Sequence, residues 1–192
     1  MEPVTLTTER LRLRPFTPAD TDAVYAACQD PDIQRWTVVP SPYERQHAED
    51  FLGRIVPDGW RTGYDLDFAV LPRAGGPLVG AIGVRGHSGV WEIGFWTAKE
   101  HRGNGYATEA VVALARWTFT TTGCTRLVWR AEVGNTGSRA VAEKAGFTVE
   151  GVQRAGLLNK GTLRDAWIGS LLPSDLGLPS TVPYLPARPN PA

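Results

Sequence analysis

Residues 92–110, EIGFWTAKEHRGNGYATEA, carry the most information about the fold of this chain. β-forming residues run to Thr97, a short turn follows, and a helical pattern begins near Ala107. Gly103 and Gly105 fall where the first helical turn begins, so backbone N–H groups there can approach an anion without an intervening Cβ. The stretch therefore predicts a strand, a phosphate-binding turn and a helix.

Two better-known phosphate loops also join a strand to a helix, and neither matches. No Lys-Ser or Lys-Thr pair follows the second glycine, as a P-loop requires, and RGNGYA is not a GxGxxG fingerprint. On the Gly-x-Gly spacing alone, the glycines could equally form a turn that binds nothing.

The rest of the chain alternates between strand and helix patterns. Gly-Gly-Pro and Gly-His-Ser-Gly turns separate three short runs rich in β-forming residues, 68–71, 78–84 and 91–97, which indicates an antiparallel meander. Asp30-Pro31 and Pro40-Ser41-Pro42 break the helical patterns nearer the N-terminus. The expected strands are 6–14, 68–71, 78–84, 91–97 and 125–133, and the expected helices are 20–29, 43–56, one from 107 that stops at Gly123, and one from Asn135 that stops at Gly146.

Length and composition indicate one ordinary globular domain. The chain has 192 residues, with 20 Lys plus Arg against 20 Asp plus Glu, so no nucleic-acid or anionic-membrane partner is expected. The two cysteines, Cys28 and Cys124, have no metal-like spacing, and the three histidines are scattered, so no metal site is expected. Without a signal peptide or a long apolar run, the expected location is the cytoplasm.

Six prolines in the last twenty residues argue against a helix or a central strand there. We therefore expect a domain over residues 1–172 and a Pro-rich extended or disordered tail over 173–192.

Residues 102–107, RGNGYA, match the (Q/R)-x-x-G-x-(G/A) loop of the Gcn5-related N-acetyltransferase (GNAT) superfamily. Residues 92–146, Glu150-Gly151 and the opening 8–14 resemble the branch typified by the ribosomal-protein N-terminal acetyltransferases RimJ and RimL. The resemblance covers roughly residues 5–172 and implies one mixed α/β domain with a mostly antiparallel, splayed central sheet and helices on both faces. The strands that splay would be 91–97 and 125–133.

The resemblance implies acetyl-coenzyme A as cosubstrate, with no metal. The phosphate loop would hold its pyrophosphate, and the backbone of the preceding strand would pair with its pantetheine arm. An amide N–H near Phe95 or Trp96 would stabilise the developing oxyanion. The expected cofactor-binding residues are Phe95, Trp96, Thr97, Arg102, Gly103, Asn104, Gly105, Tyr106, Ala107, Thr108, Asn135 and Ser138.

Asn135 and Ser138 admit two interpretations. Asn is a favoured N-cap and Ser is common in a first helical turn, so both can be structural. By the resemblance, Asn135 contacts coenzyme A and Ser138 protonates the departing thiolate as general acid.

Two departures from the family leave the general base unassigned. Ala142 stands where many members have a tyrosine acid, and Leu157 stands where the ribosomal-protein enzymes have an acidic residue. Glu92 is the first candidate base, directly or through water, although it could be a solvated strand carboxylate. Glu132 and Asp165 are weaker alternatives.

The acceptor is expected to be an amine. Deprotonation at pH 7 costs roughly 1.4 kcal/mol for an α-amine of pKa near 8 and roughly 4.6 kcal/mol for a lysine, so a weak base suits the α-amine. The same reasoning favours an α-amine or a small amine of low pKa over a lysine. By the resemblance a peptide N-terminus ranks first, closely followed by a small metabolite or antibiotic amine. Trp36 could contact this acceptor. The alternative to an enzyme is a catalytically inactive acyl-coenzyme A-binding module. The resemblance also allows a homodimer, since related enzymes often form dimers.

Overall fold

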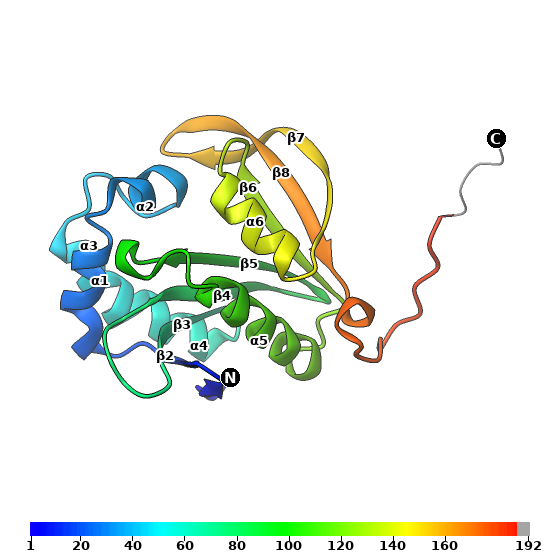
Figure 1. The fold of residues 1–192 in the computed structure, drawn as a ribbon, viewed down its shortest axis with the longest axis horizontal. Helices are drawn as coiled ribbons and strands as arrows, with labels where there is room; N and C mark the ends of the chain where they lie inside the picture. Colours follow the sequence, from blue (N-terminus) through cyan, green and yellow to red (C-terminus); the bar gives the residue numbers. More distant parts are fainter. Residues whose placement is uncertain (188–192) are drawn as a thin grey trace.

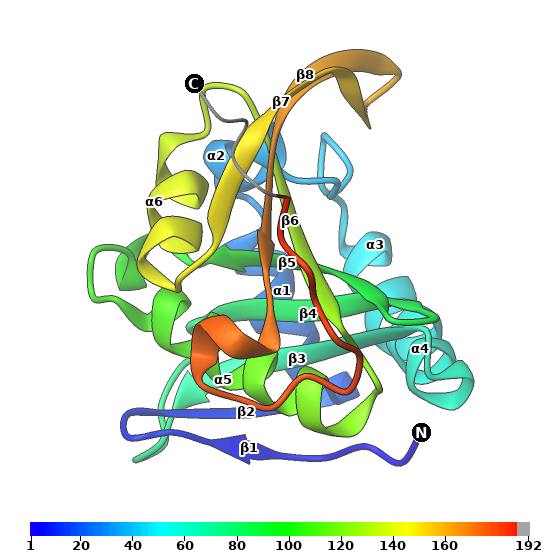
Figure 2. The ribbon, with the colours of Figure 1, turned by 90° about the vertical axis from the view of Figure 1, so that its right-hand side faces the viewer.

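The computed structural model describes residues 1–187, and it contains one eight-stranded sheet in the order β1-β2-β3-β4-β5-β6-β8-β7 (Figures 1 and 2). The end of the expected tail, residues 188–192, lies outside the described residues. Neighbouring strands are antiparallel except β5 and β6, which are parallel. The strands are β1 (Leu6–Thr7), β2 (Leu11–Pro15), β3 (Asp65–Pro72), β4 (Gly80–His87), β5 (Val90–Thr97), β6 (Arg126–Glu132), β7 (Thr148–Asn159) and β8 (Thr162–Leu171).

Helices cover both faces of this sheet. Figure 2 shows α5 and α6 on one side of the strands, with α3 and α4 on the other. The helical elements are η1 (Pro18–Asp20), α1 (Thr21–Ala27), α2 (Pro31–Trp36), α3 (Arg45–Asp50), the π-helical turn η2 (Phe51–Ile55), α4 (Val56–Thr62), η3 (Lys99–His101), α5 (Tyr106–Thr121), α6 (Thr136–Lys144) and η4 (Pro173–Leu176). The mixed α/β class expected from the sequence is confirmed.

The core follows from strand alternation and from one apolar stripe on α5. Leu66 and Phe68 on β3 are fully buried, as are Val111 and Leu114 on α5. The helix ends at Thr121, close to Gly123, whose φ of 72° suits the left-handed conformation that often follows a helix. Packing of α5 on the sheet fixes the position of the loop that precedes it.

The sheet opens between β5 and β6. The two strands pair only from Val90 opposite Arg126 to Ile93 opposite Trp129. Beyond that point β5 stays paired with β4 to Thr97, and β6 stays paired with β8 to Glu132. Figure 1 shows the resulting divergence, which widens toward α2. The splayed sheet is thus present, and residues 94–97 have no strand partner on that side among the residues that the structure describes.

The structure confirms the meander as β3, β4 and β5 and the helices that begin near Ala107 and Asn135. The expected strand 6–14 is divided into β1 and β2, and the helix expected over 43–56 continues to Thr62 as α3, η2 and α4.

The sequence predicts that Asp30-Pro31 breaks a helical pattern, and in the structure a new helix also begins at this pair. The Asp30 side chain accepts a hydrogen bond from the Asp32 N–H, and Pro31 occupies the first helical position, where a missing N–H has no cost. The result is α2, a short helix that the sequence analysis did not anticipate.

The start of the expected tail is packed rather than extended. Residues Pro173–Leu176 form η4, in which Pro173 is buried, and Leu176 and Leu178 pack against the core. Arg116 on α5 also donates a hydrogen bond to the Leu176 carbonyl. Packing thus continues to Leu178, past residue 172, and residues 179–187 have no regular structure.

Candidate functional site

The loop before α5 presents a row of free backbone N–H groups. Gly103 and Gly105 have φ values of 78° and 75°, which favour glycine. Within the described part of the chain, no N–H of residues 103–108 donates a backbone hydrogen bond. A Cβ added at Gly103 would meet nothing within 4 Å, so the loop faces open space. Six free donors at the positive end of a 16-residue helix fit an anion such as a phosphate.

Side chains from distant segments hold this loop in place. Asn104 Nδ2 donates to the carbonyls of His101 and Arg102, and Arg10 Nη1 donates to the Asn104 carbonyl. Glu109 accepts hydrogen bonds from Thr8 and Arg10. Partial burial acts to raise the pKa of Glu109, but these hydrogen bonds outweigh it and lower the pKa. The anionic Glu109 therefore anchors the first turn of α5 to the start of β2.

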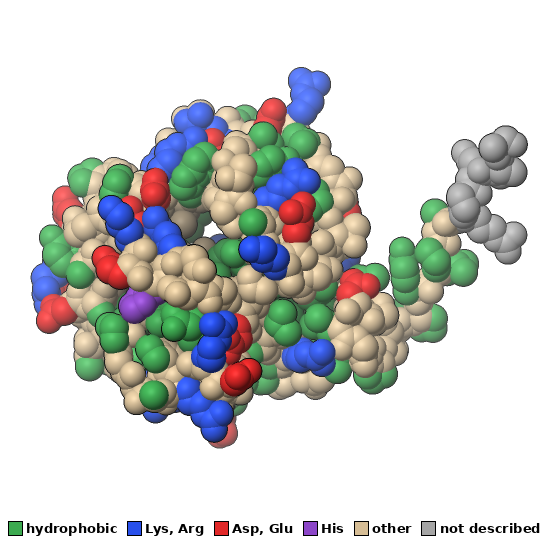
Figure 3. Space-filling model, viewed as in Figure 1, with side chains coloured by type: hydrophobic (Ala, Val, Ile, Leu, Met, Phe, Trp, Pro, Cys, Tyr) green, Lys and Arg blue, Asp and Glu red, His purple; other side chains and the backbone are tan. Residues whose placement is uncertain are grey.

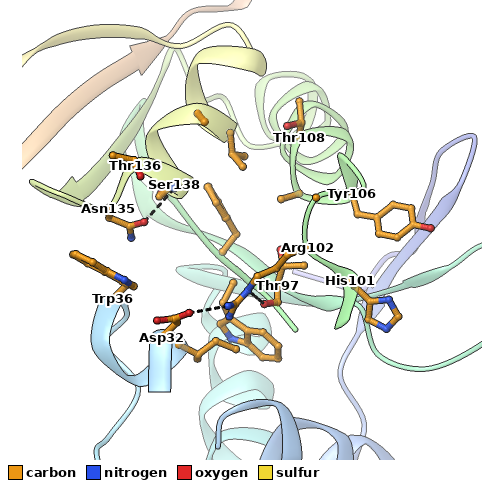
Figure 4. Close-up of a pocket in the computed structure, with 18 of the residues that line it drawn as sticks. Asp32, Trp36, Thr97, His101, Arg102, Tyr106, Thr108, Asn135, Thr136 and Ser138 are labelled. Carbon is orange, nitrogen blue, oxygen red and sulfur yellow. Dashed lines mark hydrogen bonds and ion pairs between the residues drawn. The ribbon is translucent and has the colours of Figure 1, made fainter. Parts of the chain in front are cut away.

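Arg102 joins the loop to α2. Its Nη2 contacts Asp30, its Nη1 lies 3.1 Å from Asp32 Oδ2, and its Nε donates to the Thr97 carbonyl at 3.2 Å (Figure 4). The guanidinium expected to help bind the cofactor thus holds α2 against the end of β5. This link also positions Trp36 at the end of α2.

A cavity of about 500 Å³ runs from this loop to the split in the sheet. Figure 3 shows the face of the molecule hollowed, with basic and acidic side chains around the hollow. Of the expected cofactor-binding residues only Asn104, whose amide turns back onto its own loop, does not line it. Tyr106 lines it from one side, with its ring stacked under Arg10 and directed away from Ser138 (Figure 4). We call this space the donor cavity.

Ser138 lies at the inner end of the donor cavity. The indole N–H of Trp129, on β6, donates to Ser138 Oγ at 3.0 Å, which leaves the hydroxyl proton free to be donated elsewhere. Asn135 Oδ1 accepts the Ser138 N–H at 3.1 Å and so caps α6. The capping interpretation of Asn135 is therefore correct, and both residues also line the cavity.

A second cavity, of about 590 Å³, meets the donor cavity at the split. We call it the acceptor cavity. The two share Trp36, Thr37, Phe95, Trp96, Asn135 and Ser138. Leu157, at the position where the sequence analysis looked for an acidic base, lies in its wall together with apolar side chains of the β2–β3 connection. Trp36 thus lines both cavities at their junction.

The candidate bases differ in position. Glu92 and Glu132 line the acceptor cavity, whereas Asp165 lines neither cavity and accepts the Ala155 N–H at 2.9 Å. Glu92 Oε2 accepts two hydrogen bonds from Arg130, one of them from Nε at 3.2 Å. Glu132 is paired with both terminal nitrogens of Arg35, and the Arg35 hydrogen bond lowers the pKa of Glu132. Each of the two cavity glutamates is therefore paired with an arginine.

Asp67 is a cavity carboxylate that the sequence analysis missed. It lies on β3, lines the acceptor cavity, and has a pKa raised to about 7, first by burial and then by the charge of Asp65. The expected strand began at Phe68, so both aspartates were left outside it. The alternation Asp65-Leu66-Asp67-Phe68 was the available signal, because it places both carboxylates on one strand face.

The cysteines are poor nucleophiles in this environment. Burial raises the pKa of Cys28 to about 12 and that of Cys124 to about 11, so both are neutral thiols at pH 7. Among residues 1–187, no three His, Cys, Asp or Glu side chains are grouped closely enough to hold a metal ion. Over the same residues, no helix has the length and hydrophobicity needed to cross a membrane.

Comparison with known proteins gives a consistent result. A family model described as an acetyltransferase (GNAT) domain matches residues 10–148. The uncharacterized N-acetyltransferase p20 of Bacillus licheniformis is 29% identical over 171 residues, which cover 88% of this chain and 96% of the relative. YdaF of Bacillus subtilis (strain 168), provisionally named a ribosomal N-acetyltransferase, is 38% identical over 65% of this chain and 70% of its own length.

Solved structures share the fold. A GCN5-related N-acetyltransferase from Brucella melitensis superposes with a TM-score of 0.76 at 27% identity, over 91% of this chain and 81% of its own. RimJ of Mycobacterium smegmatis, in complex with CoA-disulfide, gives a TM-score of 0.80 at 21% identity, over 92% of each chain.

Proposed function

Because the chain belongs to the GNAT acetyltransferase family, as the match over residues 10–148 shows, we propose that it transfers an acetyl group from acetyl-coenzyme A to a peptide N-terminal α-amine. Transfer is direct, within a ternary complex. The observation that carries the proposal is the meeting of two cavities at Ser138, where β5 and β6 separate. One cavity opens to a row of free N–H groups, and the other opens to solvent with carboxylates in its wall.

The donor cavity suits coenzyme A on two independent counts. The free N–H groups of residues 103–108 would bind its phosphates, and the unpaired edge of β5 at residues 94–97 would bond the amides of its pantetheine arm. When bound, acetyl-coenzyme A supplies an acetyl thioester. An N–H of Phe95 or Trp96 on that edge would stabilise the oxyanion.

Ser138 would then act as general acid. Trp129 donates to its oxygen, so the hydroxyl proton can be directed toward the departing sulfur. Glu92 remains a candidate base. Because Arg130 donates both of its hydrogen bonds to Glu92 Oε2, Glu92 Oε1 is the oxygen left to accept a proton directly or through water.

The choice of acceptor rests on amine chemistry and on the relatives. An α-amine is easily deprotonated near neutral pH and needs only a weak base. The provisional name of YdaF, at 38% identity, points to a ribosomal substrate, which also favours a protein N-terminus. A small-molecule amine is the second candidate, because a cavity of about 590 Å³ has the size of a small-ligand site.

The test is thiol release from acetyl-coenzyme A with three acceptor sets: peptides with free α-amines, lysine peptides with blocked N-termini, and small polyamines and aminoglycosides. Ser138→Ala keeps the N–H that Asn135 caps, so α6 is preserved, and Ser138→Thr is the matched control that keeps a hydroxyl. We expect release with free α-amines, a fall of about 100-fold or more in Ser138→Ala, and partial recovery in Ser138→Thr.

Turnover confined to the polyamines and aminoglycosides would establish the small-molecule reading instead. Tight binding of acetyl-coenzyme A without release to any acceptor would indicate an inactive binding module. Failure to bind acetyl-coenzyme A would overturn the proposal.

A further inference from the structure

Two glycines leave the sheet surface without side chains between Asp67 and the point where β5 and β6 separate. Asp67 on β3 pairs with Gly83 on β4, and Gly83 pairs with Gly94 on β5. A Cβ added at Gly83 would lie 2.2 Å from Asp67 Oδ1, so the carboxylate lies over the backbone of β4. A Cβ added at Gly94 would meet nothing within 4 Å. The floor between this carboxylate and β5 therefore carries no side chain.

The path ends where the reaction is proposed to occur. Pairing of β5 with β6 stops at Ile93, so Gly94 is the first residue of β5 on the open edge. Adjacent strands are about 4.8 Å apart, so a carboxylate over Gly83 lies roughly one strand spacing from Gly94. A primary amine hydrogen-bonded to Asp67 would lie in that interval, within the cavity that Phe95 and Ser138 also line.

The Asp67 carboxylate differs from those of Glu92 and Glu132 in having no partner. Among the described residues, no group donates a hydrogen bond to the Asp67 carboxylate, whereas Arg130 and Arg35 hold Glu92 and Glu132. The neighbouring Asp65 carboxylate accepts no hydrogen bond either, but Arg85 Nε lies 4.0 Å from its Oδ1. A carboxylate with an arginine partner is a weak proton acceptor. An unpartnered carboxylate that is half-buried in a cavity wall, as Asp67 is, gains from binding an ammonium group.

We propose that Asp67, rather than Glu92, binds the acceptor ammonium and removes its first proton. The inference rests on the proposed function and completes its proton balance. The nitrogen gives one proton to Asp67, which later releases it to water. The neutral amine nitrogen then bonds to the thioester carbon, and the C–S bond breaks. Ser138 gives its hydroxyl proton to the departing sulfur, and the second proton of the nitrogen passes to the Ser138 oxygen in its place. The products are the amide, the free thiol and one released proton.

The charges around Asp67 determine when it can act. Burial first and then the charge of Asp65 raise its pKa, Arg85 opposes both, and the net result is a pKa of about 7. The base works when ionised, so kcat/KM falls tenfold per pH unit as the pH drops below about 7. The titratable and charged groups that face the same cavity are Asp65 on β3, Arg85 on β4, Glu92 on β5, Arg130 and Glu132 on β6, His47, Asp50 and Arg54 on α3 and η2, Cys28 at the end of α1, and Tyr43 between α2 and α3.

The test is the pH profile of kcat/KM for two acceptors whose amines differ in pKa. We call the fall in kcat/KM at low pH the acidic limb. If this limb reports an enzyme group, its midpoint stays near pH 7 with both acceptors. If it reports the acceptor amine, its midpoint moves with the pKa of that amine. Asp67→Asn is nearly isosteric, and Gly83→Ala keeps the carboxylate but displaces it, which gives a second variant should the first fail to fold. Glu92→Gln is the matched control for the rival base. Acetyl-coenzyme A affinity, measured by calorimetry, reports whether each variant keeps its fold.

We expect Asp67→Asn to lose the limb near pH 7 and at least about 100-fold of kcat/KM, with acetyl-coenzyme A affinity unchanged. Gly83→Ala should behave similarly, and Glu92→Gln should keep the limb. Asp65→Asn should move the limb to lower pH and Arg85→Gln to higher pH, because these two charges act on Asp67 in opposite directions.

A wild-type limb that survives in Asp67→Asn and disappears in Glu92→Gln would overturn the assignment while leaving the transferase proposal intact. Absence of acceptor-dependent turnover in the wild type would remove the transferase proposal and this inference with it.

Discussion

Replacing Trp129 with phenylalanine tests whether the indole N–H orients the general acid. Trp129→Phe removes the donor that lies 3.0 Å from Ser138 Oγ and keeps an aromatic ring in the core. A neutral hydrogen bond is worth about 0.5–1.5 kcal/mol, which corresponds to about 2- to 13-fold in rate if the bond acts fully in the transition state. We therefore expect kcat to fall within that range.

The same change also affects stability, and the assay must separate the two effects. Trp129 is 1% exposed, and loss of half its ring system leaves a small cavity that costs about 1–3 kcal/mol. That cost lowers Tm by several degrees in a chain of this size. Initial rates should therefore be measured at saturating substrate, well below the Tm of the variant, with acetyl-coenzyme A affinity as the control for the donor cavity.

A double-mutant cycle with Ser138→Ala gives the decisive comparison. If Trp129 acts through the Ser138 hydroxyl, Trp129→Phe has no further effect on kcat in the Ser138→Ala background. An equal loss of kcat in both backgrounds would refute the reasoning, since Trp129 would then contribute only packing.

Three further predictions concern the phosphate loop, acid stability and the C-terminal segment. Gly105→Val should weaken acetyl-coenzyme A binding at least tenfold by calorimetry, because a β-branched residue resists the φ of 75°; unchanged affinity would exclude this loop as the phosphate site. Burial acts to raise the pKa of Asp20, but hydrogen bonds from Arg14 outweigh it and lower the pKa, so the stability it contributes is present above about pH 4 and is lost as the pH falls. Asp20→Asn should therefore lose less Tm than the wild type between pH 7 and pH 3 by calorimetry, and parallel curves would contradict this. A chain that ends at Leu172 should melt several degrees below one that ends at Leu178, because only the longer chain keeps the η4 contacts; equal Tm values would show that these contacts contribute nothing.

Local signals predicted the parts of the fold that depend on local structure. The runs of β-forming residues over 78–84 and 91–97 correspond to β4 and β5, and the glycines at 103 and 105 correspond to the left-handed turn before α5. Asn135 is a cap in the structure as the sequence indicated. These features each depend on a few neighbouring residues, which is why one sequence suffices to find them.

Features that depend on distant contacts could not be predicted in the same way. The strands β7 and β8 are interrupted by register shifts and by Ala155 at a φ of 53°, so their alternation is weak in the sequence. The contact of Arg102 with Asp30 joins residues 72 positions apart. Asp67 acquires its raised pKa only when β3 and the helices between β2 and β3 enclose it. Long-range packing, which no local pattern encodes, creates the acceptor side of the site.

The short pairing between β5 and β6 also has a thermodynamic consequence. Four residue pairs join the two halves of the sheet, and the remaining edge of β5 lacks a strand partner among residues 1–187. A ligand that bonds to that edge binds the folded chain and not the unfolded one, so it adds about 2.7 kcal/mol of stability at one hundred times its Kd. The melting temperature of this protein would therefore vary with the local supply of acyl-coenzyme A, and the chain would be most vulnerable to unfolding and proteolysis when that supply is low.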